Sequence, residues 1–138
     1  MSKKIEMDYV WPANFPEGIP ENCDVTPAEG FVYRLVRTVP PTKLDFQIHR
    51  EEKPDYVYDT KDIPKSYGVS FWSKLSKIRR VEKNYPAPEQ YGQWQTVCGK
   101  LAHTLGVVPS EVAKDGHVTL WVQEGAEPHK HIKDEVVE

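Results

Sequence analysis

The sequence has few cysteines, no long apolar run and little net charge. Each of these three features makes one class of protein less compatible with this chain. Cys23 and Cys98 form no CxxC pair, which is typical of a reduced cytosolic protein, although one disulfide closing a long loop remains an alternative. No stretch is apolar enough to span a bilayer or form a signal-peptide core, so we expect a soluble, cytoplasmic protein without a membrane partner. The formal net charge of -3 is too small to indicate a dedicated nucleic-acid partner.

Recognised catalytic motifs are also missing. The sequence contains no glycine-rich phosphate loop, no paired-carboxylate motif and no HExxH. Ser70 does not stand in a GxSxG pattern. The run from His129 to His131 lacks the additional ligands that a specific zinc site needs, so we expect no metal site and interpret this run as solvated.

The residues that are present indicate one globular domain. A chain of 138 residues has the length of a single domain, and 38% apolar and 28% charged residues are typical of a packed core with a well-solvated surface. Four prolines within residues 1–29 are spaced too closely for a helix, so this segment is expected to be an extended arm that covers a sheet edge. Residues 30–126 would form the core, and residues 127–138 a frayed tail.

Hydrophobic periodicity predicts the elements of the core. Helical spacing of apolar residues predicts a helix from Lys74 to about Tyr85. The fold class expected from this pattern is α+β, with a largely antiparallel sheet, one or two helices and the proline-rich arm. Alternation or β-forming composition predicts strands at residues 31–38, 67–72, 93–98 and 116–124.

The predicted strand at 116–124 has two contrasting faces. Alternation gives it one aliphatic face, which is expected to be core. The other face carries His117, Thr119, Trp121 and Gln123. Such a row is unusual both in bulk water and in an interior without hydrogen-bond partners. We therefore take His117 as a catalytic candidate and Thr119 as a ligand-binding candidate.

A buried charge is predicted on the strand at 31–38. Arg34 lies between two valines on a face that is expected to be buried, and a guanidinium cannot shed its proton. Its partner is either an Asp or Glu of the same chain or an anionic ligand. The ligand alternative would bring Arg34, Ser70 and His117 into one pocket for a small anionic molecule or a nucleotide.

The predicted helix suggests a different class of function. Its exposed face carries the cations Lys74, Lys77, Arg80 and Lys83. Such a face is either simply solvated or binds an acidic protein partner. The alternative function is therefore a non-catalytic interaction module, such as an antitoxin, immunity or phage-accessory protein.

The order of three residue types resembles a known family. Tyr33-Arg34 on an early strand, Ser70 on a middle strand and Glu124 at the end of a late strand resemble the Arg, Ser, Glu order of ADP-ribosyltransferases, over about residues 31–125. The resemblance implies that Arg34 and Ser70, with Tyr33 beside them, bind a dinucleotide and its ribose. It also implies NAD as the cofactor, and Glu124 as the catalytic carboxylate that stabilises an oxocarbenium-like transition state.

A second resemblance implies no reaction and no ligand. The segments at residues 30–36, 40–41, 45–46, 68–70 and 117–121 are similar to small bacterial proteins of no assigned function. A ligand-binding protein, with or without enzymatic activity, and an interaction module thus remain the two alternatives from the sequence.

Overall fold

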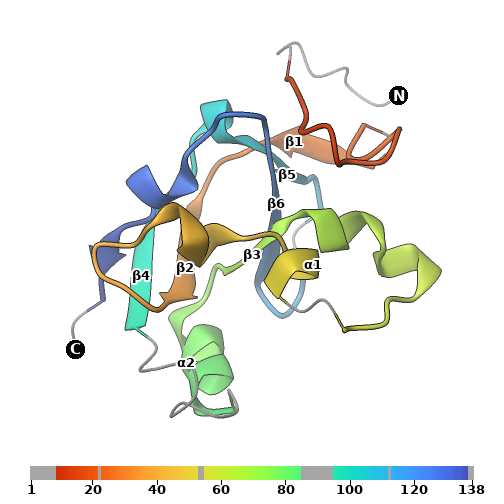
Figure 1. Ribbon diagram of the computed structural model, residues 1–138. Coiled ribbons are helices and arrows are strands. Elements are labelled where there is room, and N and C mark those ends of the chain that lie inside the picture. The colour runs from red at the N-terminus through yellow and green to blue at the C-terminus, as the bar shows by residue number, and fades with distance from the viewer. Residues whose placement is uncertain (1–8, 22, 53–54, 85–94, 112, 137–138) are drawn as a thin grey trace.

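The computed structural model describes residues 9–21, 23–52, 55–84, 95–111 and 113–136. These residues confirm the α+β class, because they contain helices and an antiparallel sheet with the strand order β1-β5-β6-β3-β2-β4-β7 (Figure 1). The strands are β1 (Val25–Pro27), β2 (Phe31–Val36), β3 (Val69–Trp72), β4 (Gln95–Lys100), β5 (Gly106–Pro109), β6 (His117–Val122) and β7 (Asp134–Glu135). The helices are α1 (His49–Glu52) and α2 (Leu75–Asn84), and the 3-10 helices are η1 (Lys43–Phe46), η2 (Thr60–Asp62), η3 (Pro64–Tyr67), η4 (His103–Leu105) and η5 (Pro128–Lys130).

The long, strongly patterned elements agree with the prediction. β2, β3, β4 and β6 lie at the predicted strands, and α2 lies at the predicted helix. The prediction missed β1, β5 and β7, which have two to four residues each. β3 is as short as β5, but its apolar Val69 and Phe71 alternate along the strand. The residues of β1, β5 and β7 show no such alternation, so these strands depend on pairing with distant residues.

One face of the sheet forms the hydrophobic core. Phe46 of η1 packs on this face against Phe71, with the ring centroids 5.9 Å apart. Ile132, from the segment after η5, is fully buried in the same cluster. The sheet residues of this cluster are Val32, Val36, Val69, Phe71, Val97, Val108 and Leu120.

The C-terminal segment differs from the predicted frayed tail. β7 pairs with β4, and the amide of Val136 donates to the carbonyl of Thr96. A side chain at Gly99 would collide with the backbone at His131 and Ile132, so glycine permits this close approach. The prediction was wrong because backbone pairing and the burial of one isoleucine leave no periodic signal in a charged segment.

The described part of the N-terminal arm covers a sheet edge, as predicted, but the chain before β1 forms turns and is not extended. It is built of turns followed by a short strand: the amide of Phe15 donates to the carbonyl of Pro12, and β1 pairs with β5 at the sheet edge. Trp11 stacks on Phe15, which in turn packs edge-on against Tyr67 of η3. The arm is thus held by aromatic contacts and covers the β5 edge.

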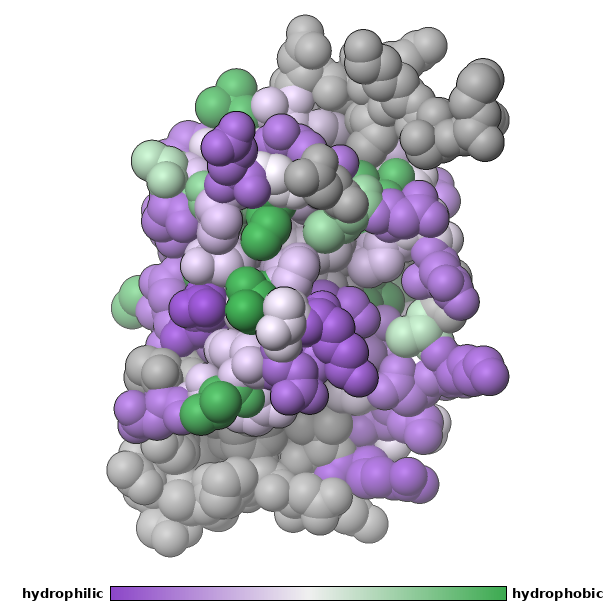
Figure 2. Space-filling model, turned by 90° about the vertical axis from the view of Figure 1, so that its right-hand side faces the viewer, coloured by the Kyte–Doolittle hydropathy of each residue, from purple (hydrophilic) through white to green (hydrophobic). Residues whose placement is uncertain are grey.

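The surface drawn in Figure 2 is mainly hydrophilic. Its hydrophobic residues are separate spots among hydrophilic ones. A broad apolar patch, the usual sign of a hydrophobic docking surface, is not seen on this face.

Candidate functional site

Ser70, His117 and Thr119, three residues selected from the sequence, line one cavity. β3 and β6 pair with Ser70 opposite Thr119, and alternation places His117 on the same face. This face is opposite the hydrophobic core. The cavity has a volume of about 180 Å³. Its other lining residues come from α1, η2, η3 and the chain between α1 and η2: His49, Tyr56, Tyr58, Asp62, Lys65 and Ser66.

His117 contributes a neutral imidazole to the cavity. Its ring packs edge-on against Trp72, with 5.0 Å between the ring centroids. Burial is the main cause that lowers the pKa of His117; Lys65 and His49 lower it further, and Asp115 opposes them. The ring is therefore available at neutral pH as an acceptor of a hydrogen bond or a proton.

His49 and Tyr58 form a second polar pair in the cavity. The Nδ1 atom of His49 and the Tyr58 hydroxyl share a hydrogen bond of 2.5 Å, and Tyr56 packs against both rings. Burial raises the pKa of the Tyr58 phenol more than the neighbouring Arg50 lowers it. The phenol therefore keeps its proton at neutral pH, and the cavity contains a hydroxyl group and a second imidazole.

Two cations border these groups. Lys65 lines the cavity with its side chain exposed, so its ammonium can meet an anion that arrives from solution. Arg50 is used structurally: its Nε donates to Ser66 Oγ at 2.8 Å, and its guanidinium lies 4.6 Å from the centroid of the Tyr67 ring. These contacts tie α1 to η3 and hold the cavity walls together.

Arg34 does not belong to this cavity. The register of β2 with β4 places it on the core face, and it is only 5% exposed. Its guanidinium donates to the carboxylate of Glu52 at 2.8 Å, to the carbonyl of Asp45 at 2.8 Å and to the carbonyl of Ser70 at 2.6 Å. The intramolecular ion pair, one of the two alternatives left by the sequence, is the arrangement observed. The guanidinium is thus paired within the protein and is not directed into the His117 cavity.

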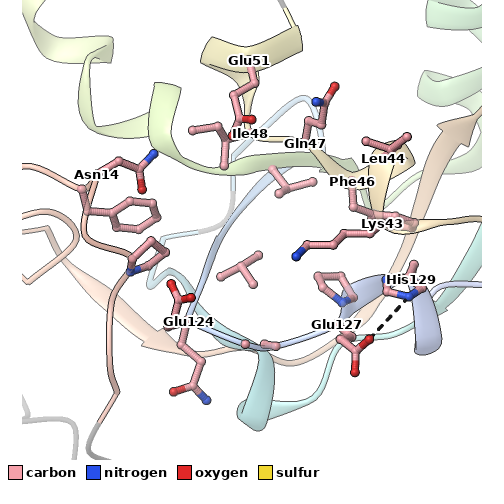
Figure 3. A pocket seen from close by; sticks show the side chains of 18 residues that line it. Asn14, Lys43, Leu44, Phe46, Gln47, Ile48, Glu51, Glu124, Glu127 and His129 are labelled. Carbon is pink, nitrogen blue, oxygen red and sulfur yellow. Dashed lines mark ion pairs between the residues drawn. The ribbon is translucent and has the colours of Figure 1, made fainter.

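Tyr33 and Glu124 do not line this cavity either, although Tyr33 shares the sheet face of His117, with Trp72 of β3 between them in the register. Tyr33 packs edge-on against Phe31, with 5.4 Å between the ring centroids. Glu124 is exposed and lines a different cavity, beneath the N-terminal arm (Figure 3). The structure therefore gathers Ser70, His117 and Thr119, but not Tyr33, Arg34 and Glu124, at one site.

Sequence reasoning missed His49, Tyr56, Tyr58 and Lys65. The two tyrosines are visible in the sequence as isolated apolar positions in a polar segment, but local patterns do not connect them with a strand 60 residues later. Short helices α1, η2 and η3 make this connection. Their positions depend on tertiary contacts such as the hydrogen bond from the His49 amide to the Gly68 carbonyl.

Other expected sites have less structural support. Arg80 is exposed on α2 and Lys74 is exposed just before it, whereas Lys77 is half-buried. The side chain of Lys83 lies outside the described residues, so the acidic-partner hypothesis stays a prediction. In the described ranges, no three His, Cys, Asp or Glu side chains cluster in a way that could hold a metal ion. Cys23 and Cys98 are free thiols. No helix in the described part of the chain has the length and apolarity needed to cross a bilayer.

Comparisons with protein-family models, with curated proteins and with solved structures found no match to this chain.

The lowered pKa of His117 predicts a pH-dependent stability. Because the folded-state pKa lies below that of the unfolded chain, about 6.5, the unfolded state takes up the proton more readily as the pH falls. The contribution of His117 to the free energy of unfolding is thus present above this pH and decreases below it. Urea titrations between about pH 8 and pH 5 should show a smaller loss for His117→Gln than for the wild type.

The control for this experiment is His103→Gln, which removes an exposed imidazole at η4. If His117→Gln and the wild type lose the same stability on acidification, burial does not disfavour the charged form of His117.

Proposed function

We propose that the cavity lined by Ser70, His117 and Thr119 binds a small anionic ligand, with a phosphate group of the nucleotide type as the best fit. The observation that carries the proposal is the convergence of a neutral imidazole, hydroxyl groups and the Lys65 ammonium in one cavity. Hydroxyls and an ammonium donate hydrogen bonds to phosphate oxygens. The neutral His117 ring is the group that would accept a proton from the ligand.

The volume limits which part of a ligand enters. About 180 Å³ is less than the 300 Å³ or more of most pockets for drug-sized molecules. A phosphate or ribose group would occupy the cavity, and the remainder of a nucleotide would extend outside. Tyr56 is 57% exposed at the border, where its ring offers a stacking surface for a base.

The resemblance to ADP-ribosyltransferases stays a hypothesis about the reaction. It needs an arginine and a glutamate close to the ligand, whereas Arg34 is paired with Glu52 and Glu124 lines the other cavity. The proposal is therefore limited to ligand binding with His117 as proton acceptor. NAD belongs in the ligand panel, since it is the cofactor that this resemblance implies.

Isothermal titration with inorganic phosphate, AMP, ADP and NAD tests the proposal. We expect at least one phosphate compound to bind the wild type, and Lys65→Gln to weaken its binding about tenfold, because a charge-assisted hydrogen bond is lost. His117→Gln should weaken binding and reduce its pH dependence; the ionisation of the phosphate group itself accounts for the remainder. The matched controls Lys100→Gln and His103→Gln change exposed residues elsewhere and should bind as the wild type does. Absence of binding by all four compounds, or equal binding by Lys65→Gln and the wild type, would show that the proposal is wrong.

A further inference from the structure

A second and larger cavity lies beneath the N-terminal arm. Its volume is about 430 Å³, which is within the range of small-molecule sites. One wall is the arm, a second wall is the chain from η1 to α1, and the third is the chain between β6 and η5 (Figure 3). It shares no lining residue with the His117 cavity.

The inner surface of this cavity is apolar. Val69 and Phe46, which are 1% and 7% exposed, belong to the hydrophobic core and reach the cavity from the sheet and from η1. Ile48 and Val122 pack against the same core, and Phe15 contributes an aromatic ring from the arm. An apolar group of a ligand would be removed from water here, which stabilises a complex.

Charges of opposite sign face one another across this apolar surface. Figure 3 shows the Lys43 ammonium pointing into the cavity from the η1 side and the Glu124 carboxylate pointing into it from the opposite wall. Within the described part of the chain, neither side chain takes part in an ion pair. Glu127 is different, because its carboxylate already binds the Lys130 ammonium at 3.0 Å. Lys43 and Glu124 are thus two facing charges that a ligand can meet; Glu51 is a further lining carboxylate, and Lys43 also acts electrostatically on Glu127.

We propose that this cavity binds a small zwitterion with an apolar side chain, namely an apolar α-amino acid. The ammonium group of the ligand would meet Glu124, and its carboxylate would meet Lys43. Its side chain would cover the surface formed by Phe46, Val69 and Val122. A ligand with one charge would leave one wall unpaired, so the two facing charges favour a zwitterion over a simple amine or a fatty acid.

Calorimetric titration of the full chain with leucine and phenylalanine, and with two derivatives of leucine, tests this proposal. Leucinamide lacks the carboxylate and N-acetylleucine lacks the ammonium. We expect leucine or phenylalanine to bind, and each derivative to bind about tenfold more weakly than leucine or worse, because each loses one charge-assisted hydrogen bond.

Two variants assign the charges to the two walls. Glu124→Gln should weaken leucine binding about tenfold but leave N-acetylleucine unaffected, and Lys43→Met should weaken leucine but leave leucinamide unaffected. Glu135→Gln and Lys100→Met, which change exposed residues on β7 and β4, are the matched controls and should bind as the wild type does.

Three results would overturn the proposal: no binding of leucine or phenylalanine at tens of millimolar, equal binding of leucine and both derivatives, or leucine binding that neither variant weakens. Binding should also be unchanged in His117→Gln, since the two cavities share no lining residue. This inference can therefore fail while the proposed anion site stands, and the anion site can fail while this inference stands.

Discussion

Replacing Arg34 by methionine should destabilise the fold by about 3 kcal/mol, because removing one partner of a buried ion pair leaves the other uncompensated. The variant would leave three acceptors without the hydrogen bonds that the guanidinium donates: the Glu52 carboxylate and the carbonyl groups of Asp45 and Ser70. For a chain of this length, such a loss lowers the melting temperature by about 10 °C. Chemical denaturation, with tryptophan fluorescence as the signal, measures the loss in the free energy of unfolding directly.

Arg34→Lys should recover only part of this stability. A lysine retains the charge, but its ammonium cannot reach three acceptors that lie in the fixed directions of a guanidinium. Glu52→Gln in the Arg34→Met background should regain stability, because it removes the unpaired charge. Lys100→Met, at an exposed position of β4, is the control. A loss below about 1 kcal/mol for Arg34→Met would mean that these three contacts do not hold the fold together.

Gly106→Ala should destabilise the fold by about 4 kcal/mol, from backbone strain and steric overlap together. Gly106 opens β5 with φ of 150°, a conformation that strains a residue with a Cβ atom. A Cβ atom at this position would also collide with the carbonyl group of Trp121 and lie 3.2 Å from the Cα atom of Val122. Since β5 pairs with β6 here, the collision would separate the two strands.

Gly30→Ala separates the cost of backbone strain from the cost of steric overlap. Gly30 also has a positive φ, of 99°, but a Cβ atom there would meet no atom within 4 Å. Its expected cost is backbone strain alone, about 1 to 2 kcal/mol. Urea denaturation of both variants, with circular dichroism as the signal, compares them. If Gly106→Ala costs no more than Gly30→Ala, the close approach of β5 and β6 adds nothing to the requirement for glycine.

The elements that were predicted correctly have local causes. β2, β6 and α2 each contain at least six residues whose apolar positions repeat with the period of a strand or a helix. Strand alternation alone also placed His117 and Thr119 on one face, and Ser70 joined them because β3 pairs with β6 in the observed register. These three residues are the part of the candidate site that could be found without coordinates.

The remaining part of the candidate site depends on contacts between distant residues. His49 and Lys65 reach the cavity through short helical segments, and Tyr58 reaches it from the chain between α1 and η2; these segments carry too few residues for a periodic signal. Glu124 was predicted at the same site as His117, but the structure places it in the cavity beneath the arm. Strand alternation already places Glu124 on the face of Val122, opposite His117, and in the structure Val122 and Glu124 both line the cavity beneath the arm.

The amino-acid sequence by itself determined that this protein is an α+β domain with an antiparallel sheet, and that Arg34 is a buried charge in need of an anion. Periodicity and the permanent charge of a guanidinium are properties of neighbouring residues, so they can be read along the chain. Only the tertiary structure decided that this anion is Glu52, 18 residues away, and that His117 and Glu124 line separate cavities. Such choices follow from the packing of segments far apart in the sequence, where many partners are chemically equivalent and geometry alone selects one.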